Sequence, residues 1–391
     1  MRYARRSKNC FRVGDDARNV VYIPSQLRGK QESRWRKYLM RRLCLRVVLA
    51  AGIAMLASVG FAKHDQSAGP YKVLKTAKVG GEGGFDYITA DVEGRRLYVP
   101  RNGPMGQLTA FNLDTLEPAG TIAGLKSGGA AVDPKSHHGF STTTPITMWD
   151  SKTLQVIKTI NVDGRPDGIM FDPFNERVWV LSHMPPYATV IDAKEGTVAG
   201  TIDLGGQPEQ AATDGKGTVY VNIMDKANIA VVDAKNLTVT KHLDLSSKGV
   251  DAGSGLSLDT KNHVLFSYWR LPTPVVLIVN AENGNIISSF PTDVNVDTVG
   301  FNPATMEAIS TAGGGSMIFI KENSPTSFEV EQRLKTMVGA RNMVLDTKTN
   351  RVFSVAFEYG PVPANAPAPV PGRMALGPPL PGSFTLLMVG K

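Results

Sequence analysis

Five charged residues recur at one position of a repeat of about 42 residues, and four of them are carboxylates. They are Asp86, Asp167, Glu209, Asp297 and Arg341. Carboxylate oxygens bind hard divalent cations such as calcium or magnesium. A ring of like charges is costly unless cations, hydrogen-bond donors or raised pKa values relieve it. The pattern predicts a site for a cation or a small polar ligand. The alternative is that these carboxylates cap backbone N–H groups or are separately solvated.

A second group of candidate binding residues follows the second strand of several repeats, in segments expected to share a face with the first group. The main candidates are Arg101, His183, Tyr187, Trp269 and Arg270, and Asn102, Asn222, Tyr268, Glu358 and Tyr359 accompany them. Only His183 among the histidines is expected there, which disfavours a three-histidine metal cage. The candidate metal ligands are therefore Asp86, Asp167, Glu209 and Asp297. A divalent cation such as calcium is the one cofactor considered.

An internal repeat positions these candidates, and residues 166–204 are its template. The segment 177–180 alternates as a half-buried strand does, and an Asp172-Pro173 turn precedes it. Four short antiparallel strands in about forty residues are the size of one propeller blade. Equivalents of Asp172 occur seven times, at Asp91, Asp133, Asp172, Asp214, Asp259, Asn302 and Asp346. The predicted fold is all-β, a seven-bladed β-propeller.

The last repeat ends after its third strand, at 384–389, and the missing fourth strand is at the other end of the repeat region. Residues 71–79 match the pattern of the fourth strand at 154–162. We expect this N-terminal strand to pair with the last blade, because a ring closed in this way has no open edge. The propeller would cover 71–391. A Pro-rich loop insertion at 358–381 either folds over the channel mouth as a lid or is a tolerated insertion.

The repeat resembles that of the YVTN-repeat β-propellers, the YncE-like family of exported seven-bladed proteins. The similarity is carried by the second strands at 96–99 and 218–222, the segment 230–234, and the end of the Pro-rich insert at 381–384. The resemblance implies the fold and leaves the activity open. Similar seven-bladed folds include lactonases, which makes a metal-assisted hydrolase an alternative function.

The front of the chain differs from the repeats in composition. Residues 40–62 combine a basic segment with sixteen apolar or small residues, as a cleaved signal peptide does, and both cysteines, Cys10 and Cys44, precede the repeats. The twin-arginine pair at 41–42 leaves general and twin-arginine export as alternatives. We interpret 1–39 as an over-called start or a disordered extension and 63–70 as a linker. The expected location is periplasmic or secreted, with no membrane span after signal cleavage.

Charge and motifs narrow the function. The chain carries a net charge of +8, but its first 62 residues hold 14 of the 43 basic groups and 3 of the 35 acidic groups. The repeats are slightly acidic, which disfavours nucleic acid as a partner. Neither a nucleophile elbow nor an H-E-x-x-H motif occurs, and no catalytic residue is assigned. The favoured hypothesis is a monomeric, exported, non-catalytic propeller that binds a small molecule, ion or protein at the channel mouth. Single-stranded nucleic-acid binding is the weakest alternative.

Overall fold

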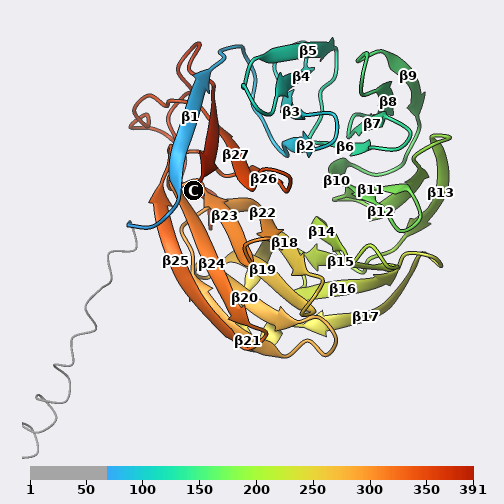
Figure 1. Cartoon of the computed structure of the whole chain (residues 1–391), viewed down its shortest axis with the longest axis vertical. Helices are drawn as coiled ribbons and strands as arrows, with labels where there is room; N and C mark the ends of the chain where they lie inside the picture. Colours follow the sequence, from blue (N-terminus) through green and yellow to red (C-terminus); the bar gives the residue numbers. More distant parts are fainter. Residues whose placement is uncertain (1–67) are drawn as a thin grey trace, which may run out of the picture. The chain divides into compact units, whose positions relative to one another are not determined.

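The computed structural model describes residues 68–391, so the predicted extension, the signal peptide and most of the linker lie outside the described residues. The described residues belong to one compact unit, Asp65–Lys391. In this unit seven four-stranded antiparallel sheets form a ring (Figure 1). The prediction of an all-β, seven-bladed propeller is confirmed.

The strands follow one another from the innermost to the outermost position in each blade. Blades one and two contain β2 (Thr89–Asp91), β3 (Arg96–Arg101), β4 (Gln107–Asn112), β5 (Pro118–Ala123), β6 (Ala130–Asp133), β7 (His138–Ser141), β8 (Ile146–Asp150) and β9 (Val156–Ile160). Blades three and four contain β10 (Pro166–Asp172), β11 (Arg177–Ser182), β12 (Ala188–Asp192), β13 (Thr197–Ile202), β14 (Pro208–Thr213), β15 (Thr218–Ile223), β16 (Asn228–Asp233) and β17 (Thr238–Asp244).

The remaining blades follow the same order. Blades five and six contain β18 (Asp251–Asp259), β19 (Val264–Leu271), β20 (Val275–Asn280), β21 (Ile286–Pro291), β22 (Val296–Asn302), β23 (Glu307–Ala312), β24 (Ser316–Ser324) and β25 (Ser327–Lys335). Blade seven contains β26 (Met343–Asp346), β27 (Arg351–Ala356), β28 (Thr385–Gly390) and β1 (Lys72–Lys78). The one helical element within residues 68–391 is the short 3₁₀ turn η2 (Ser246–Lys248). No helix in this part of the chain has the length and apolar character that a membrane span requires.

The repeated Asp or Asn residue caps the turn between the first and second strands of a blade. Oδ1 of Asp133 accepts the backbone N–H of Lys135 at 2.9 Å, and Oδ1 of Asp346 accepts that of Lys348 at 3.1 Å. Four residues after six of these positions the backbone has a positive φ, at Arg95, His137, Glu176, His263, Met306 and Asn350. A capped turn that ends in one left-handed residue makes a tight hairpin. The marker recurs because almost every blade uses this connection.

The blades pack face to face, so the middle strands are buried on both sides. In β11 every residue after Arg177 is buried, whereas the outermost strand of the same blade, β13, is mostly exposed. Trp179 of β11 packs with β14–β16 side chains such as Val221 in the cluster between blades three and four. Continuous apolar runs therefore mark the middle strands of a blade, and the weak alternation at 197–202 marks an outermost strand.

The N-terminal strand closes the ring, as expected from the sequence. Strand β1 pairs antiparallel with β28, from Lys72 opposite Gly390 to Lys78 opposite Thr385 (Figure 1). Just before β1, the ring of Tyr71 stacks on Phe319 of blade six at 3.6 Å, and its hydroxyl bonds to Glu307. Gln332 bonds to both the N–H and the C=O of Tyr71, at 2.8 and 2.9 Å. Blade six therefore holds the start of the strand that completes blade seven.

Removal of residues 63–80 tests the importance of this closure. The deletion would expose the edge of β28, all of whose residues are buried, and would leave Glu307 and Gln332 without their Tyr71 partners. We expect the melting temperature, measured by circular dichroism, to fall by about 10 °C or more. Lys72→Ala, which trims an exposed side chain of β1, is the control and should change it little. An unchanged melting temperature in the deletion variant would contradict the closure.

Candidate functional site

Charged side chains at the starts of first strands and at the ends of second strands lie at one end of the central channel. The second residue of each of the innermost strands β10, β14 and β22 is acidic. These residues are Asp167, Glu209 and Asp297. His183 follows the second strand β11, and Arg270 is near the end of the second strand β19. In an antiparallel blade the start of the first strand and the end of the second are adjacent, so these residues meet at the channel mouth.

One half of this cluster is a buried network of ion pairs, which we call the paired half. Arg270 donates to Glu209 at 3.1 Å and to Asp297 at 2.6 Å, and its Nε bonds to the Val296 carbonyl at 3.1 Å. Arg341 donates to the second oxygen of Asp297 at 2.9 Å and lies 3.7 Å from Asp86. The side chains of Arg270, Glu209 and Asp297 are 5%, 6% and 9% exposed. Each buried carboxylate of this half has a guanidinium partner.

The paired half keeps Asp297 ionised in spite of its burial. Burial favours the neutral acid, but the charges of Arg341 and Arg270 outweigh it, so the pKa of Asp297 lies below its usual value. Asn342 adds a hydrogen bond from Nδ2 to the same carboxylate at 3.1 Å. These contacts join blades five, six and seven at the axis. These contacts offset the repulsion between carboxylates that the sequence pattern predicts.

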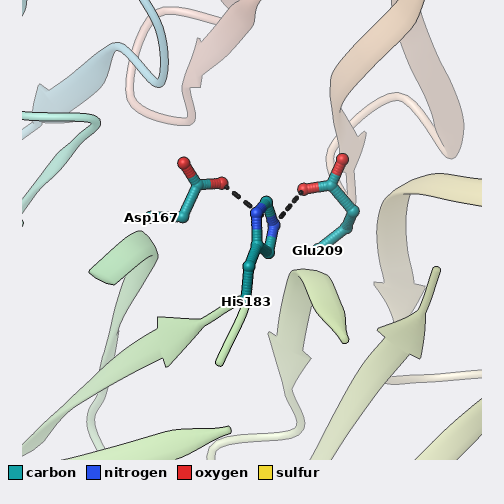
Figure 2. A group of neighbouring side chains, drawn as sticks. All are labelled: Asp167, His183 and Glu209. Carbon is teal, nitrogen blue, oxygen red and sulfur yellow. Dashed lines mark ion pairs between the residues drawn. The ribbon is translucent and has the colours of Figure 1, made fainter. Parts of the chain in front are cut away.

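The other half has more acid than base, and we call it the open half. Nε2 of His183 lies 3.4 Å from Oδ2 of Asp167 and 3.4 Å from Oε2 of Glu209 (Figure 2). Nε2 is buried yet makes no hydrogen bond of normal geometry. On the other side of the ring, Nη2 of the exposed Arg165 approaches Nδ1 at 2.6 Å. The imidazole therefore points its less satisfied nitrogen at two carboxylates.

The pKa values of the open half record this crowding. The Glu209 carboxylate raises the pKa of His183 above its ordinary value, and burial opposes this shift. Burial, and then the charge of Glu209, raises the pKa of Asp167. In the paired half, burial and the charge of Asp297 raise the pKa of Asp86 well above its usual range, with Arg341 acting against them. A cation bound between Asp167, His183 and Glu209 would offset the negative charge that helps raise the pKa values of His183 and Asp167.

Three of the predicted binding residues do not reach the cluster. Arg101 is 3% exposed, its guanidinium lies 3.7 Å from the ring centre of Phe384, and it donates to the carbonyls of Gly80, Gly81 and Gly83. Trp269 is 1% exposed and packs in the core of blades four and five. Tyr187 packs beside the core of blades three and four. Arg101, Trp269 and Arg270 are all buried, so these side chains are not exposed for stacking on a nucleic-acid strand.

The accompanying candidates mostly have structural partners. Asn222 and Tyr268 are buried, and Nδ2 of Asn222 donates to the Ser254 carbonyl at 3.2 Å. Asn102 donates to the Ser127 carbonyl at 2.9 Å, and Glu358 pairs with Lys78 at 2.8 Å. Tyr359 forms an isolated β-bridge with Pro379 inside the insertion.

Sequence reasoning missed three members of the cluster: Tyr87, Arg165 and Asn342. The hydroxyl of Tyr87 donates to Glu209 at 3.2 Å, and burial, then the charge of Glu209, raises the pKa of that tyrosine well above its ordinary value. Tyr87 and Asn342 directly follow the mouth positions Asp86 and Arg341, and Arg165 lies two residues before Asp167. The signal that could have found them is adjacency to a mouth position.

A cavity of about 480 Å³ occupies the channel below the cluster. Its upper end is lined by Tyr87, Glu209 and Leu181, and much of its wall is apolar, with Ile169 and Val299 as examples. The side chain of Gln210 crosses this wall, donating to the Val299 carbonyl and accepting from the Leu256 and Val299 N–H groups. The charged mouth therefore opens onto a mainly apolar space of the size that small-molecule sites have.

Two curated proteins are similar to a part of the chain. Over 130 residues the chain is 29% identical to the uncharacterized protein YncE of Escherichia coli O157:H7 and 28% identical to that of Escherichia coli strain K12. Part of this β-propeller chain is therefore similar to YncE. The matched segment is 30% of this chain and 36% of the length of each relative, so it spans only about a third of those proteins.

Among solved structures, the chain resembles Kuenenia stuttgartiensis hydrazine synthase. The TM-score is 0.60, the sequence identity is 14%, and the match covers 75% of this chain and 95% of that chain. At this identity the likeness shows the fold alone. No protein-family profile matches the chain.

Replacement of Arg270 tests the paired half. Arg270→Met would leave Glu209 and Asp297 buried with one charge partner fewer, which should lower the free energy of unfolding by about 3–5 kcal/mol in urea titrations at pH 7. Lys152→Met removes an exposed charge on a turn and should have little effect. Adding Glu209→Gln to Arg270→Met should recover part of the loss, because Glu209 is the carboxylate left without a guanidinium partner, whereas Asp297 keeps its pair with Arg341. Equal stability of Arg270→Met and the native chain would contradict this account.

Proposed function

We propose that this propeller is an exported, non-catalytic binding protein whose channel mouth takes a divalent metal ion through Asp167, His183 and Glu209. The observation that carries the proposal is that one donor atom from each residue lies within 4.8 Å of the other two. Export rests on the composition of 40–62. Binding at the mouth rests on the geometry of the open half.

The separations between donor atoms suit a small metal ion. In a tetrahedral site with bonds of 2.0–2.1 Å, neighbouring ligand atoms are about 3.4 Å apart. Nε2 of His183 has this separation from an oxygen of Asp167 and from an oxygen of Glu209. Calcium prefers oxygen ligands alone, whereas imidazole with carboxylates suits zinc, manganese or iron. The histidine therefore moves the proposal from calcium to a transition metal.

Metal binding requires a specific tautomer of His183. Nε2 must be unprotonated to coordinate, so Nδ1 must carry the proton. Arg165 now approaches Nδ1 as a donor, so its side chain has to withdraw or rotate when a metal binds. Arg165 is exposed and has room to do so. Its departure would also remove a positive charge that opposes protonation of His183 and binding of a cation.

A second candidate function is metal-assisted hydrolysis, which the three-ligand set favours. Three protein ligands leave a fourth position of a tetrahedral metal for water or substrate, as in catalytic zinc sites. The cavity below the mouth offers space for a small substrate. Turnover of lactones by the manganese-loaded or zinc-loaded protein would support this function over simple binding.

Calorimetric titration with Mn²⁺ and Zn²⁺ tests the proposed function. The native chain should bind one ion, and Asp167→Asn, His183→Ala and Glu209→Gln should each weaken binding by about tenfold or more, since each loses a ligand. Asp86→Asn is the matched control, because it removes a mouth carboxylate outside the three-residue set and should have a smaller effect. Binding of no ion by the native chain, or equal loss in all four variants, would refute the site.

The same titration should depend on pH. The pKa values of His183 and Asp167 are raised, so protons compete with the metal at a higher pH than for ordinary side chains. Affinity for Mn²⁺ should therefore be greatest at pH 8 and fall by about tenfold or more by pH 6. Circular dichroism at both pH values controls for unfolding. An affinity independent of pH would show that His183 is not a ligand.

A further inference from the structure

The Pro-rich insertion at 358–381 approaches the channel mouth. We call its middle part, residues 361–377, the strap. The insertion leaves blade seven after β27 and returns to β28. Its base is fixed by backbone hydrogen bonds from Gly360 to the Pro378 carbonyl at 2.9 Å and from Leu380 to the Glu358 carbonyl at 2.8 Å. The base therefore holds the two ends of the strap together.

The strap reaches Arg270, the central cation of the paired half. A Cβ added at Gly372 would lie 2.8 Å from Cβ of Arg270, so only a residue without a side chain fits against it at this distance. Gly372 also has a φ of +75°, which favours glycine. The strap thus spans from blade seven to blade five along the rim of the mouth. The close contact with Arg270 and the positive φ together indicate that Gly372 has a defined position against the propeller.

The next residue brings a positive charge to the rim. Arg373 is exposed, and its charge helps lower the pKa of the buried Asp297. The mouth has four carboxylates, Asp86, Asp167, Glu209 and Asp297, and within residues 68–391 two guanidinium groups, those of Arg270 and Arg341, form ion pairs with them. Arg373 therefore stands where positive charge is in deficit.

The strap is loosely packed against the propeller. A cavity of about 420 Å³ separates Met374 and Leu376 of the strap from Val338 and Phe357 of the propeller. Between its ends the strap's own backbone hydrogen bonds are short-range turns, such as Arg373 N–H to the Val370 carbonyl at 3.0 Å. Because no strand lies between β27 and β28, the strap can lift while the blades stay in place.

We propose that the strap is a lid on the channel mouth, that Arg373 supplies positive charge to the carboxylate cluster when the lid is closed, and that a divalent cation in the open half releases it. This inference rests on the proposed function, because the releasing cation is the one held by Asp167, His183 and Glu209. Arg373 and the metal ion compete for the same negative potential without sharing ligands.

Metal affinity gives the first test. Arg373→Gln removes the competing charge and should bind Mn²⁺ about threefold or more tightly than the native chain in calorimetric titrations at low salt. Lys261→Gln is the matched control, since it removes one exposed positive charge at a turn of blade five and should leave the affinity unchanged. Equal affinities for Arg373→Gln and the native chain would overturn the proposed competition.

Trypsin gives an independent readout of the strap, because Arg373 is the one Lys or Arg within 358–381. Cleavage between Arg373 and Met374, followed by mass spectrometry, should be faster with Mn²⁺ than without it. The increase should vanish in the combined Asp167→Asn and Glu209→Gln variant. If the native chain binds Mn²⁺ and the cleavage rate does not change, the lid inference fails and the proposed function stands.

A third arm separates the two failures when the native chain binds no Mn²⁺. The proposed function, and release by a cation with it, would then be wrong. The double variant Asp86→Asn with Asp167→Asn still tests whether charge holds the lid. Both aspartates are partly exposed, and asparagine has nearly the same shape as aspartate without its charge. Faster cleavage at Arg373 in this variant supports a lid held by the mouth carboxylates. An unchanged rate overturns it.

Discussion

Seven innermost strands that converge on one axis crowd whatever charge their first residues carry. In this propeller four of the seven blades carry an acid at the repeat position of Asp86, and each of these carboxylates lies beside a basic side chain. Carboxylates held close in a partly dry site repel one another strongly, since the effective dielectric constant there is well below that of water. The arrangement of the mouth follows from how this repulsion is offset.

The offset comes from a blade whose own mouth residue is uncharged. In blade five the residue at the repeat position of Asp167 is Ser254, which is uncharged, and Arg270 of the same blade brings a positive charge to the mouth. Arg270 then pairs with Glu209 of blade four and Asp297 of blade six, so one guanidinium joins three consecutive blades. Arg341, at the mouth position of blade seven, extends the pairing to Asp86 of blade one. Blade three lacks such a partner, and its Asp167 faces a histidine instead.

Much of this could be read from the sequence, and the rest depended on side-chain direction. The period of the repeat located the blades, the closing strand and the residues at the channel mouth, because almost every blade uses the same capped hairpin at similar spacing. It did not reveal which neighbour at a strand end points to the axis. Trp269 and Arg270 are adjacent, and alternation along β19 sends the indole into the core and the guanidinium to the mouth. Arg101 is likewise drawn away by the rings of Phe384 and Phe357.

Glu209 links the structural and the binding roles of the cluster, because its two oxygens face different halves. Oε1 accepts from Arg270 in the paired half, and Oε2 faces His183 and Tyr87 in the open half. A cation that draws on Oε2 leaves the Oε1 pair in place, so the open half can gain a ligand without loss of the contacts that hold the blades. Any ion bound there also stabilises the folded ring by mass action. Because Arg270 holds Glu209 through Oε1, the paired half fixes the position of Oε2 for a ligand in the open half.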